Sequence, residues 1–258
     1  MRAPMAFVLA VTNQKGGVGK TTTAVNIAAQ LAMMRHRVML VDLDPQGNAT
    51  SSLGIEKDAL ELSLYDVFSG KAEVSEVVQM TNIDNLFVLP ATTELAQTEV
   101  DLVNQLSREM FLSRMITAVD TDVIIIDCPP ALGLLTVNAL TAADGVLIPV
   151  QAEYFALEGL GQLLQTIQLV KHNLNSKLEI FGVVLTMFTK RTVLSEQVQK
   201  EVAEHFKEKL FKSVIPRNVR LAEAPSFGKT IFEHDRWSKG AKAYKSLAVE
   251  IEKRANLK

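Results

Sequence analysis

A glycine-rich loop between an apolar run and a helical pattern most constrains the fold of this chain. The apolar run Phe7–Thr12 leads into NQKGGVGKTT at residues 13–22, and a helical pattern follows. A loop that leaves a buried strand and opens a helix directs several backbone N–H groups, together with the helix N-terminus, at one point. Such a point binds phosphate, so the sequence predicts a phosphate-binding loop.

The side chains of this loop suit a nucleotide. Its glycines allow close backbone approach, Lys20 supplies charge to the β- and γ-phosphates, and the Thr21 hydroxyl can ligate Mg²⁺. Gln14 occupies the position of the first glycine of a Walker A motif, which makes the loop a deviant one. A glycine-rich turn that binds nothing is disfavoured by the strand context, the two lysines and the threonine run. The predicted ATP-binding residues are Lys15, Gly16, Gly17, Val18, Gly19, Lys20, Thr21 and Thr22.

Lys15 is a second lysine inside the loop, and it cannot easily reach the same γ-phosphate as Lys20. If it crossed to the nucleotide of a partner subunit, it would act as an arginine finger does. The spacing alone favours the plainer interpretation, a solvated lysine where the loop begins.

Acidic residues end two further apolar runs. Asp42 and Asp44 follow the run that begins at Val38, and Asp127 ends the run Val123–Asp127, the position of a Walker B aspartate. The four apolar residues before Asp127 favour a metal role over a structural cap. One of Asp42 and Asp44 can orient the attacking water, and the spacing does not choose between them.

Alternating apolar runs and helical patterns predict an α/β fold: a doubly wound, mostly parallel sheet with helices on both faces and ligands at the carboxyl ends of the strands. Helical spacing is clear over residues 155–170 and 244–251. With 258 residues, 48% of them hydrophobic, and no break in composition, one domain over residues 1–258 is expected. The predicted strands are Phe7–Thr12, Val38–Asp42, Leu86–Leu89, Val123–Asp127, Val146–Val150 and Gly182–Met187.

Charge is distributed unevenly along the chain. Residues 187–258 hold 16 Lys and Arg against 9 Asp and Glu, whereas residues 1–186 hold 11 against 20. This asymmetry indicates an anionic partner for the C-terminal part, or a solvated lysine-rich surface. The single cysteine excludes an intrachain disulfide, and the apolar segment near the N-terminus is too short for a signal sequence or a membrane span. We therefore expect a cytoplasmic protein that does not enter a membrane.

Taken together, five runs resemble the small Soj-type ParA ATPases of the MinD/ParA superfamily. They are KGGVGKTTT at 15–23, VDLDPQGNAT at 41–50, IIIDCPP at 124–130, PVQAEY at 149–154 and IPRNVRLAEAPSFGK at 215–229. The resemblance covers nearly the whole chain, and the last run is distinctive within the superfamily. It implies an ATP-hydrolysing protein that segregates replicated DNA together with a ParB/Spo0J-type centromere-binding partner.

The resemblance also assigns roles that spacing leaves open. It implies that Lys15 contacts ATP across a sandwich homodimer, that Gly16 lies at the dimer seam, and that Asp44 positions the hydrolytic water. Thr21 would ligate Mg²⁺, and Asp127 would act on the metal through water. Pro216 and Asn218 fall at the adenine pocket. Sequence-independent binding of double-stranded DNA on the nucleoid falls to Arg191 and Arg220. Beyond the resemblance, we expect Lys190 or Arg217 to contribute to the same binding.

One segment departs from the family pattern. The family usually has an acid before the matching arginine, whereas Thr189 and Lys190 precede Arg191 here. The added charge would strengthen DNA binding, and any hydrogen bond from the missing acid would change.

Other classes fit less well. A MinD-like membrane ATPase would need a bulky amphipathic tail, and 245–258 reads instead as a packing helix. An iron–sulfur reductase would need more than Cys128, and a tyrosine autokinase more than three scattered tyrosines. A DNA-binding module that uses ATP as a switch remains the alternative. The sequence identifies neither the cargo nor whether gradients or filaments move it, nor any role in replication initiation.

Overall fold

The computed structural model describes residues 6–117, 119–153, 160–189 and 193–257. Its centre is one seven-stranded sheet of order β3-β4-β2-β5-β1-β6-β7. All neighbouring strands are parallel except β3 and β4, which pair antiparallel at one edge. The strands are β1 Phe7–Val11, β2 Val38–Asp42, β3 Gln79–Met80, β4 Leu86–Leu89, β5 Val123–Asp127, β6 Gly145–Gln151 and β7 Glu179–Thr186.

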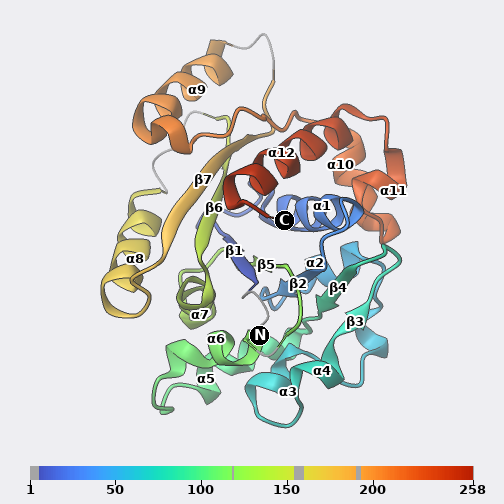
Figure 1. The fold of residues 1–258 in the computed structure, drawn as a ribbon, viewed down its shortest axis with the longest axis vertical. Coiled ribbons are helices and arrows are strands. Elements are labelled where there is room, and N and C mark those ends of the chain that lie inside the picture. The colour runs from blue at the N-terminus through green and yellow to red at the C-terminus, as the bar shows by residue number, and fades with distance from the viewer. Residues whose placement is uncertain (1–5, 118, 154–159, 190–192, 258) are drawn as a thin grey trace.

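Helices cover both faces of this sheet, as Figure 1 shows. The α-helices are α1 Lys20–Met33, α2 Asn48–Ser52, α3 Leu64–Phe68, α4 Val74–Val77, α5 Thr98–Asp101, α6 Phe111–Ile116, α7 Leu134–Ala142, α8 Leu160–Asn173, α9 Val193–Phe206, α10 Val219–Glu223, α11 Ile231–Asp235 and α12 Lys239–Ala255. Short 3₁₀ helices are η1 Lys57–Ala59, η2 Thr93–Gln97, η3 Arg108–Met110, η4 Lys207–Lys209 and η5 Ala224–Phe227. The doubly wound fold predicted from the alternation is confirmed.

Two hydrophobic cores follow from this layering. Side chains alternate across each strand, so Leu9 and Val11 enter the core beneath α1 and α12, while Val8 and Ala10 enter the core beneath α3, α6 and α7. Strands buried on both faces need apolar residues at nearly every position, and the central strands have them. The apolar runs therefore identified six of the seven strands.

Strand boundaries differ from the prediction where the backbone turns. β7 ends at Thr186 rather than Met187, because Met187 has a left-handed φ of 50° that breaks the extended conformation. β7 also begins earlier, at Glu179, since its first residues pair with Gly145 and Val146 of β6. β3 was not predicted: it has only two residues and no apolar run.

The last helix packs on the first. The Tyr244 hydroxyl of α12 lies 3.1 Å from Thr23 Oγ1 of α1, and His36 Nε2, just after α1, lies 2.7 Å from Glu252 Oε1. α12 is the helix that the spacing of Tyr244, Leu247, Ala248 and Ile251 predicted, and all four are buried. Val249 is the only large apolar residue that α12 exposes, as expected for a packing helix. No helix in the described part of the chain is both long and apolar enough to cross a membrane.

Candidate nucleotide-binding site

The carboxyl ends of β1, β2 and β5 meet at one edge of the sheet. Val11 and Asp42 both pair with Asp127, so the loop that leaves β1 begins beside the two acidic strand ends. Asp42 and Asp127 are fully buried, and Asp44 is nearly so. The structure thus brings together the loop and the three carboxylates that the sequence predicted.

Hydrogen bonds from distant strands hold the loop in place. Asn13 donates to Pro149 O at 2.7 Å and accepts from the Lys15 amide at 3.0 Å. Thr186, at the end of β7, donates its hydroxyl to Val18 O at 2.8 Å. Gly19 precedes α1 with φ of 86°, a left-handed conformation that favours glycine. The loop is therefore preorganised before any ligand arrives.

The two loop lysines have opposite surroundings. Lys20 is buried and donates to Lys15 O at 3.1 Å, which turns its ammonium back under the loop. Burial lowers the pKa of Lys20, and the nearby carboxylates, Asp127 first, oppose that shift. The side chain of Lys15 is exposed, and its backbone is held on both sides, by Asn13 and by Lys20.

Asp127 is the most unusual acid of the site. Both carboxylate oxygens are buried, and no described group hydrogen-bonds either of them with good geometry. Burial raises the pKa of Asp127 well above its ordinary value and the charge of Asp42 adds to the rise, while the nearby Thr21 hydroxyl opposes it. An unsatisfied buried carboxylate beside a threonine hydroxyl is a position that Mg²⁺ and its water ligands would satisfy.

A bound Mg²⁺ would need further ligands, however. Among the described residues, no three His, Cys, Asp or Glu side chains converge as a metal cluster. Mg²⁺ is commonly held by one or two protein oxygens, several waters and the phosphates of a nucleotide. The residues present fit that type of site.

Asp42 and Asp44 differ in what their carboxylates do. Asp42 Oδ2 accepts the amide and the hydroxyl of Thr50, each at 2.7 Å, and Oδ1 accepts the Asp44 amide at 3.3 Å. Burial raises the pKa of Asp42 to about 6, against these hydrogen bonds. Within the described residues, the carboxylate of Asp44 accepts only the Gln46 amide, at 3.0 Å through Oδ1.

A cavity of about 190 Å³ lies beside the loop. Gly19 and Thr22 border it, as do Thr186, Tyr244 and Leu221. Pro216 and Asn218 line it as well, so the two residues expected at an adenine pocket adjoin the phosphate loop. Asn218 Oδ1 accepts the Arg220 amide at 2.8 Å, which orients its side-chain amide.

Of the basic residues expected to bind DNA, the structure describes Arg217 and Arg220. Arg220 is exposed and pairs with Glu223 at 2.9 Å, the surface ion pair that its sequence position suggested as an alternative. Arg217 forms an ion pair with Glu153 at 3.2 Å and also lines the cavity of about 190 Å³ beside the loop. Lys190 and Arg191 lie outside the described residues.

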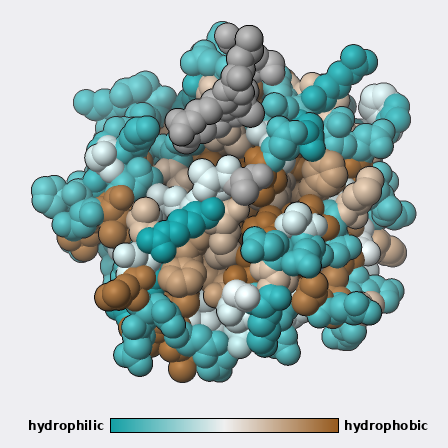
Figure 2. Space-filling view, turned by 60° about the horizontal axis from the view of Figure 1, so that its bottom comes forward, coloured by the Kyte–Doolittle hydropathy of each residue, from teal (hydrophilic) through white to brown (hydrophobic). Residues whose placement is uncertain are grey.

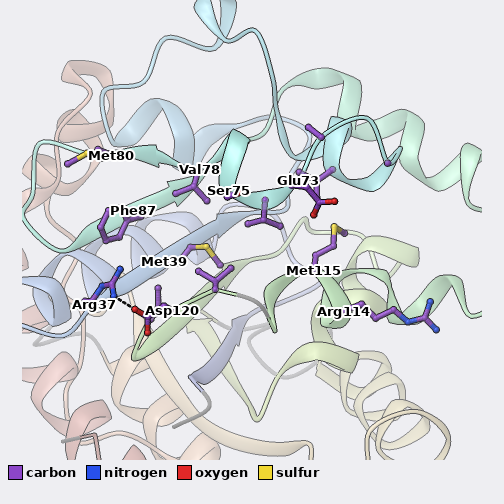
Figure 3. Close-up of a pocket in the computed structure, with 16 residues that line it drawn as sticks. Arg37, Met39, Glu73, Ser75, Val78, Met80, Phe87, Arg114, Met115 and Asp120 are labelled. Carbon is purple, nitrogen blue, oxygen red and sulfur yellow. Dashed lines mark hydrogen bonds and ion pairs between the residues drawn. The ribbon is translucent and has the colours of Figure 1, made fainter. Parts of the chain in front are cut away.

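A larger cavity, of about 690 Å³, lies at the opposite edge of the sheet (Figure 3). Met39, Phe87 and Met115 give it an apolar lining, and its Arg37 is already paired with Asp120. The side of the molecule that carries α3 to α6 comes forward in Figure 2, where hydrophilic residues form most of the outline and apolar ones show between them. No phosphate-binding loop borders this cavity among the described residues, so it is not the nucleotide site despite its size.

Three residues of the site escaped sequence reasoning. Asn13 and Thr186 brace the loop, and Thr50 engages Asp42. Asn13 adjoins the motif and could have been examined for that reason. Thr186 gave no signal, because its partner Val18 lies 168 positions away in the chain.

Comparison with known proteins places this geometry in context. A family profile described as an AAA domain matches residues 6–180. The sporulation initiation inhibitor protein Soj of Bacillus subtilis is 56% identical over 96% of this chain and 98% of its own, and the chromosome partitioning protein ParA of Myxococcus xanthus is 50% identical over 98% and 90%. A relative from Treponema pallidum, described as a chromosome-partitioning ATPase Soj, is 48% identical over 96% and 97%.

Solved structures agree in fold. A Mycobacterium smegmatis protein described as cobyrinic acid a,c-diamide synthase, solved with ADP and magnesium, is 40% identical, with a TM-score of 0.86 over 98% of this chain and 96% of its own. The cell division ATPase MinD of Pyrococcus furiosus is 29% identical, with a TM-score of 0.80 over 96% and 99%.

Proposed function

Since the chain belongs to the Soj/ParA family of chromosome-partitioning ATPases, we propose that it segregates DNA as an ATP-driven dimer and that a ParB/Spo0J-type partner stimulates its hydrolysis. It is an ATPase whose cofactors are ATP and Mg²⁺. The observation that best supports ATP binding is the buried Lys20 beneath a braced phosphate loop, next to the unsatisfied carboxylate of Asp127.

Residues 15–22 hold the phosphates of ATP, and the Pro216–Asn218 cavity holds the adenine. Thr21 would ligate Mg²⁺ directly, and Asp127 would hold it through a water. A bound Mg²⁺ would supply positive charge to the β- and γ-phosphate oxygens. Asp44 orients the attacking water, because its Oδ2 accepts no hydrogen bond from any described residue, whereas Asp42 is committed to Thr50.

Lys15 acts across a sandwich dimer. Its backbone is fixed by Asn13 and Lys20 while its side chain is exposed, which supports a contact of the ammonium with a second subunit. Gly16 beside it is exposed, and a Cβ there would meet nothing within 4 Å, which leaves room for a second subunit at the seam. ATP favours the dimer only by its higher affinity for that state.

The ATP dimer binds double-stranded DNA through phosphate contacts, which carry no sequence information. Arg191 and Arg220, with Lys190 or Arg217, supply the charge, so the protein works in the cytoplasm on the nucleoid. The ion pair of Arg220 with Glu223 is exposed, and such pairs contribute only about 0–1 kcal/mol, which leaves Arg220 available. We treat residues 1–258 as one ATPase domain, because α12 packs on the helix that follows the phosphate loop.

The alternative is a DNA-binding module in which ATP is a switch and hydrolysis is incidental. Phosphate release separates the two. The ATPase function predicts slow basal release that rises when DNA and a ParB-type partner are added together. A rate that no partner changes would contradict a segregation role.

The phosphate site itself is tested by paired lysine variants. Lys20→Ala should lose nucleotide binding, measured with a fluorescent ATP analogue. Lys15→Ala should keep binding but lose hydrolysis, because transition-state charge stabilisation in trans is worth about 10³–10⁵ in rate. Lys177→Ala, an exposed lysine at the opposite edge of the sheet, is the control and should match the wild type.

Equal nucleotide affinity in Lys20→Ala and the wild type would show that the phosphate site lies elsewhere. Normal hydrolysis by Lys15→Ala would remove the role of Lys15 in trans and leave the site itself intact.

A further inference from the structure

The chain has a single tryptophan, and it is exposed. Trp237 follows the end of α11, and 71% of its surface is accessible. The Arg236 guanidinium lies over the ring, 4.7 Å from its centroid, a cation–π contact. One face of the indole is thus occupied by a cation, and the high exposure leaves the ring open elsewhere.

Asp235 ties this tryptophan to the proposed DNA-binding arginine. Asp235 Oδ1 accepts the Trp237 amide at 3.2 Å, and Oδ2 lies 3.7 Å from Arg220 Nε. One carboxylate therefore links the backbone of Trp237 with the guanidinium of Arg220. The aromatic ring and the phosphate-binding charge belong to the same corner of the molecule, around α10 and α11.

The charge of this corner suits a polyanion. Residues 217–242 hold six Lys and Arg against three Asp and Glu. Asp235 and Glu223 are both engaged with Arg220, and no ion pair is found within the described residues for Lys229, Arg236 or Lys239. An exposed aromatic ring among unpaired cations is the arrangement with which proteins bind single strands, where bases stack on rings and phosphates meet cations.

We propose that Trp237 is a stacking platform for the unpaired bases of single-stranded DNA, next to the phosphate contact of Arg220. The inference rests on the proposed DNA-binding function and extends its ligand class. A duplex covers the flat faces of its own bases, so only a single strand offers a free base to the open side of the indole. The ring supplies stacking, Arg236 adds a cation to it, and Arg220 holds the neighbouring phosphate.

A membrane surface is the competing ligand, because tryptophan and basic residues also gather at lipid headgroups. Lipid binding in the interface plane needs a continuous apolar helix face. Here Trp237 follows the five-residue helix α11, and α12 exposes Val249 alone among its large apolar residues. Val219 and Phe227 are exposed as well, but they lie on the separate short segments α10 and η5 and so form no continuous helix face. The observations therefore favour DNA.

The sole tryptophan makes the first test label-free. The Asp44→Ala protein with ATP and Mg²⁺ is titrated with a thymidine oligomer, and the emission of Trp237 is recorded. Stacking predicts saturable quenching without a blue shift. An abasic strand of equal length, which has the phosphates but not the bases, should leave the emission nearly unchanged, and equal quenching by the two strands would overturn the proposal.

Binding constants of a variant provide the second test. Trp237→Ala should weaken binding of the thymidine oligomer about 5- to 150-fold, since stacking on one aromatic ring is worth about 1–3 kcal/mol per base. The same variant should bind the abasic strand and a mixed-sequence duplex within about twofold of the wild-type value. Trp237→Tyr keeps a ring and should restore most of the affinity for the oligomer.

The outcomes separate this inference from the function on which it rests. Arg220→Glu should weaken binding of the thymidine oligomer, the abasic strand and the duplex. Unchanged duplex binding by that variant would contradict the proposed DNA site. If Arg220→Glu loses DNA affinity as expected but Trp237→Ala keeps its affinity for the thymidine oligomer, only the stacking role is overturned. A blue shift of Trp237 on vesicles of anionic lipid, without quenching by the oligomer, would assign the tryptophan to a membrane.

Discussion

Asp42 and Asp44 stand two positions apart, and their hydrogen bonds give them different tasks. Asp42 is fully buried and joins β2 to the first turn of α2 through Thr50. Thr50 Oγ1 in turn accepts the Ala91 amide at 3.0 Å, which extends the connection to the end of β4. Asp44 lies beyond the strand and holds only a local turn. We therefore expect Asp42 to act on stability, whereas Asp44 is the residue proposed for chemistry.

Alanine variants at these two positions should separate the tasks. Asp44→Ala should lose hydrolysis and accumulate the ATP dimer, measured by light scattering, with a stability loss of about 1 kcal/mol from one hydrogen bond. Asp42→Ala leaves two donors of Thr50 without their acceptor, and we expect a loss of about 2–4 kcal/mol in urea unfolding. If Asp44→Ala with ATP stays monomeric at micromolar concentration, the dimer mechanism fails.

At this scale, the sequence predicted the residues proposed to touch the ligand better than those that support them. Lys20, Thr21 and Asp127 belong to short sequence motifs that indicate phosphate or metal binding, and the structure brings them together. Asn13 and Thr186 support the loop through partners 136 and 168 positions away. Pairings of that range depend on strand order, which no local pattern contains.

At the scale of elements, two turns meet at a pair of glycines. Gly54 follows α2 and Gly228 follows η5, each with a positive φ, of 79° and 60°. A Cβ on Gly228 would come within 2.8 Å of Gly54 Cα. The segment that carries Asp42's partner Thr50 and the segment that follows Arg220 are therefore packed backbone to backbone.

A pair of glycine substitutions tests this contact. Gly228→Ala places an alanine in a left-handed conformation, which costs about 1–2 kcal/mol, and its Cβ meets the backbone of Gly54. We therefore expect the free energy of unfolding in urea to fall by at least that amount. Gly161→Ala is the matched control: Gly161 lies in α8 with nothing within 4 Å, and alanine there should stabilise by about 0.5–1 kcal/mol. Equal stability of the two variants would show that the turns do not constrain each other.

Elements were predictable where burial was complete. β2, β4 and β5 match their predicted bounds because every residue is apolar or ends the strand with an acid. β3 was missed, since its two residues are not buried and an antiparallel edge strand needs no apolar run. The remaining differences are ends of strands, where pairing partners rather than composition decide the last residue.

At the scale of the molecule, positive charge gathers in the C-terminal part of the chain. Dimerisation would bring two copies of that surface to one ligand, and the second contact then forms at high effective concentration. ATP would thereby control DNA affinity without touching DNA.

Salt dependence measures how many phosphates are contacted. In the ATP dimer, Arg220→Glu removes two contacts, so the slope of log affinity for duplex DNA against log salt should flatten by about 1.8. Arg114→Glu makes the same charge change at the opposite edge of the sheet, where Arg114 is exposed and lines the large cavity, and should leave the slope unchanged. Parallel slopes for both variants would mean that Arg220 acts through overall charge and not by contact.

The packing of α12 on α1 has a consequence for how the protein is made. The ribosome delivers α12 about 200 residues after α1. At a synthesis rate of 5–20 residues per second, the side of α1 that α12 will cover stays uncovered for roughly 10–40 s. During that interval the nascent chain offers chaperones a bare helix directly behind its phosphate loop. A truncated chain that ends before Lys239 holds Lys15, Lys20, Asp44 and Asp127 but lacks the helix that covers α1.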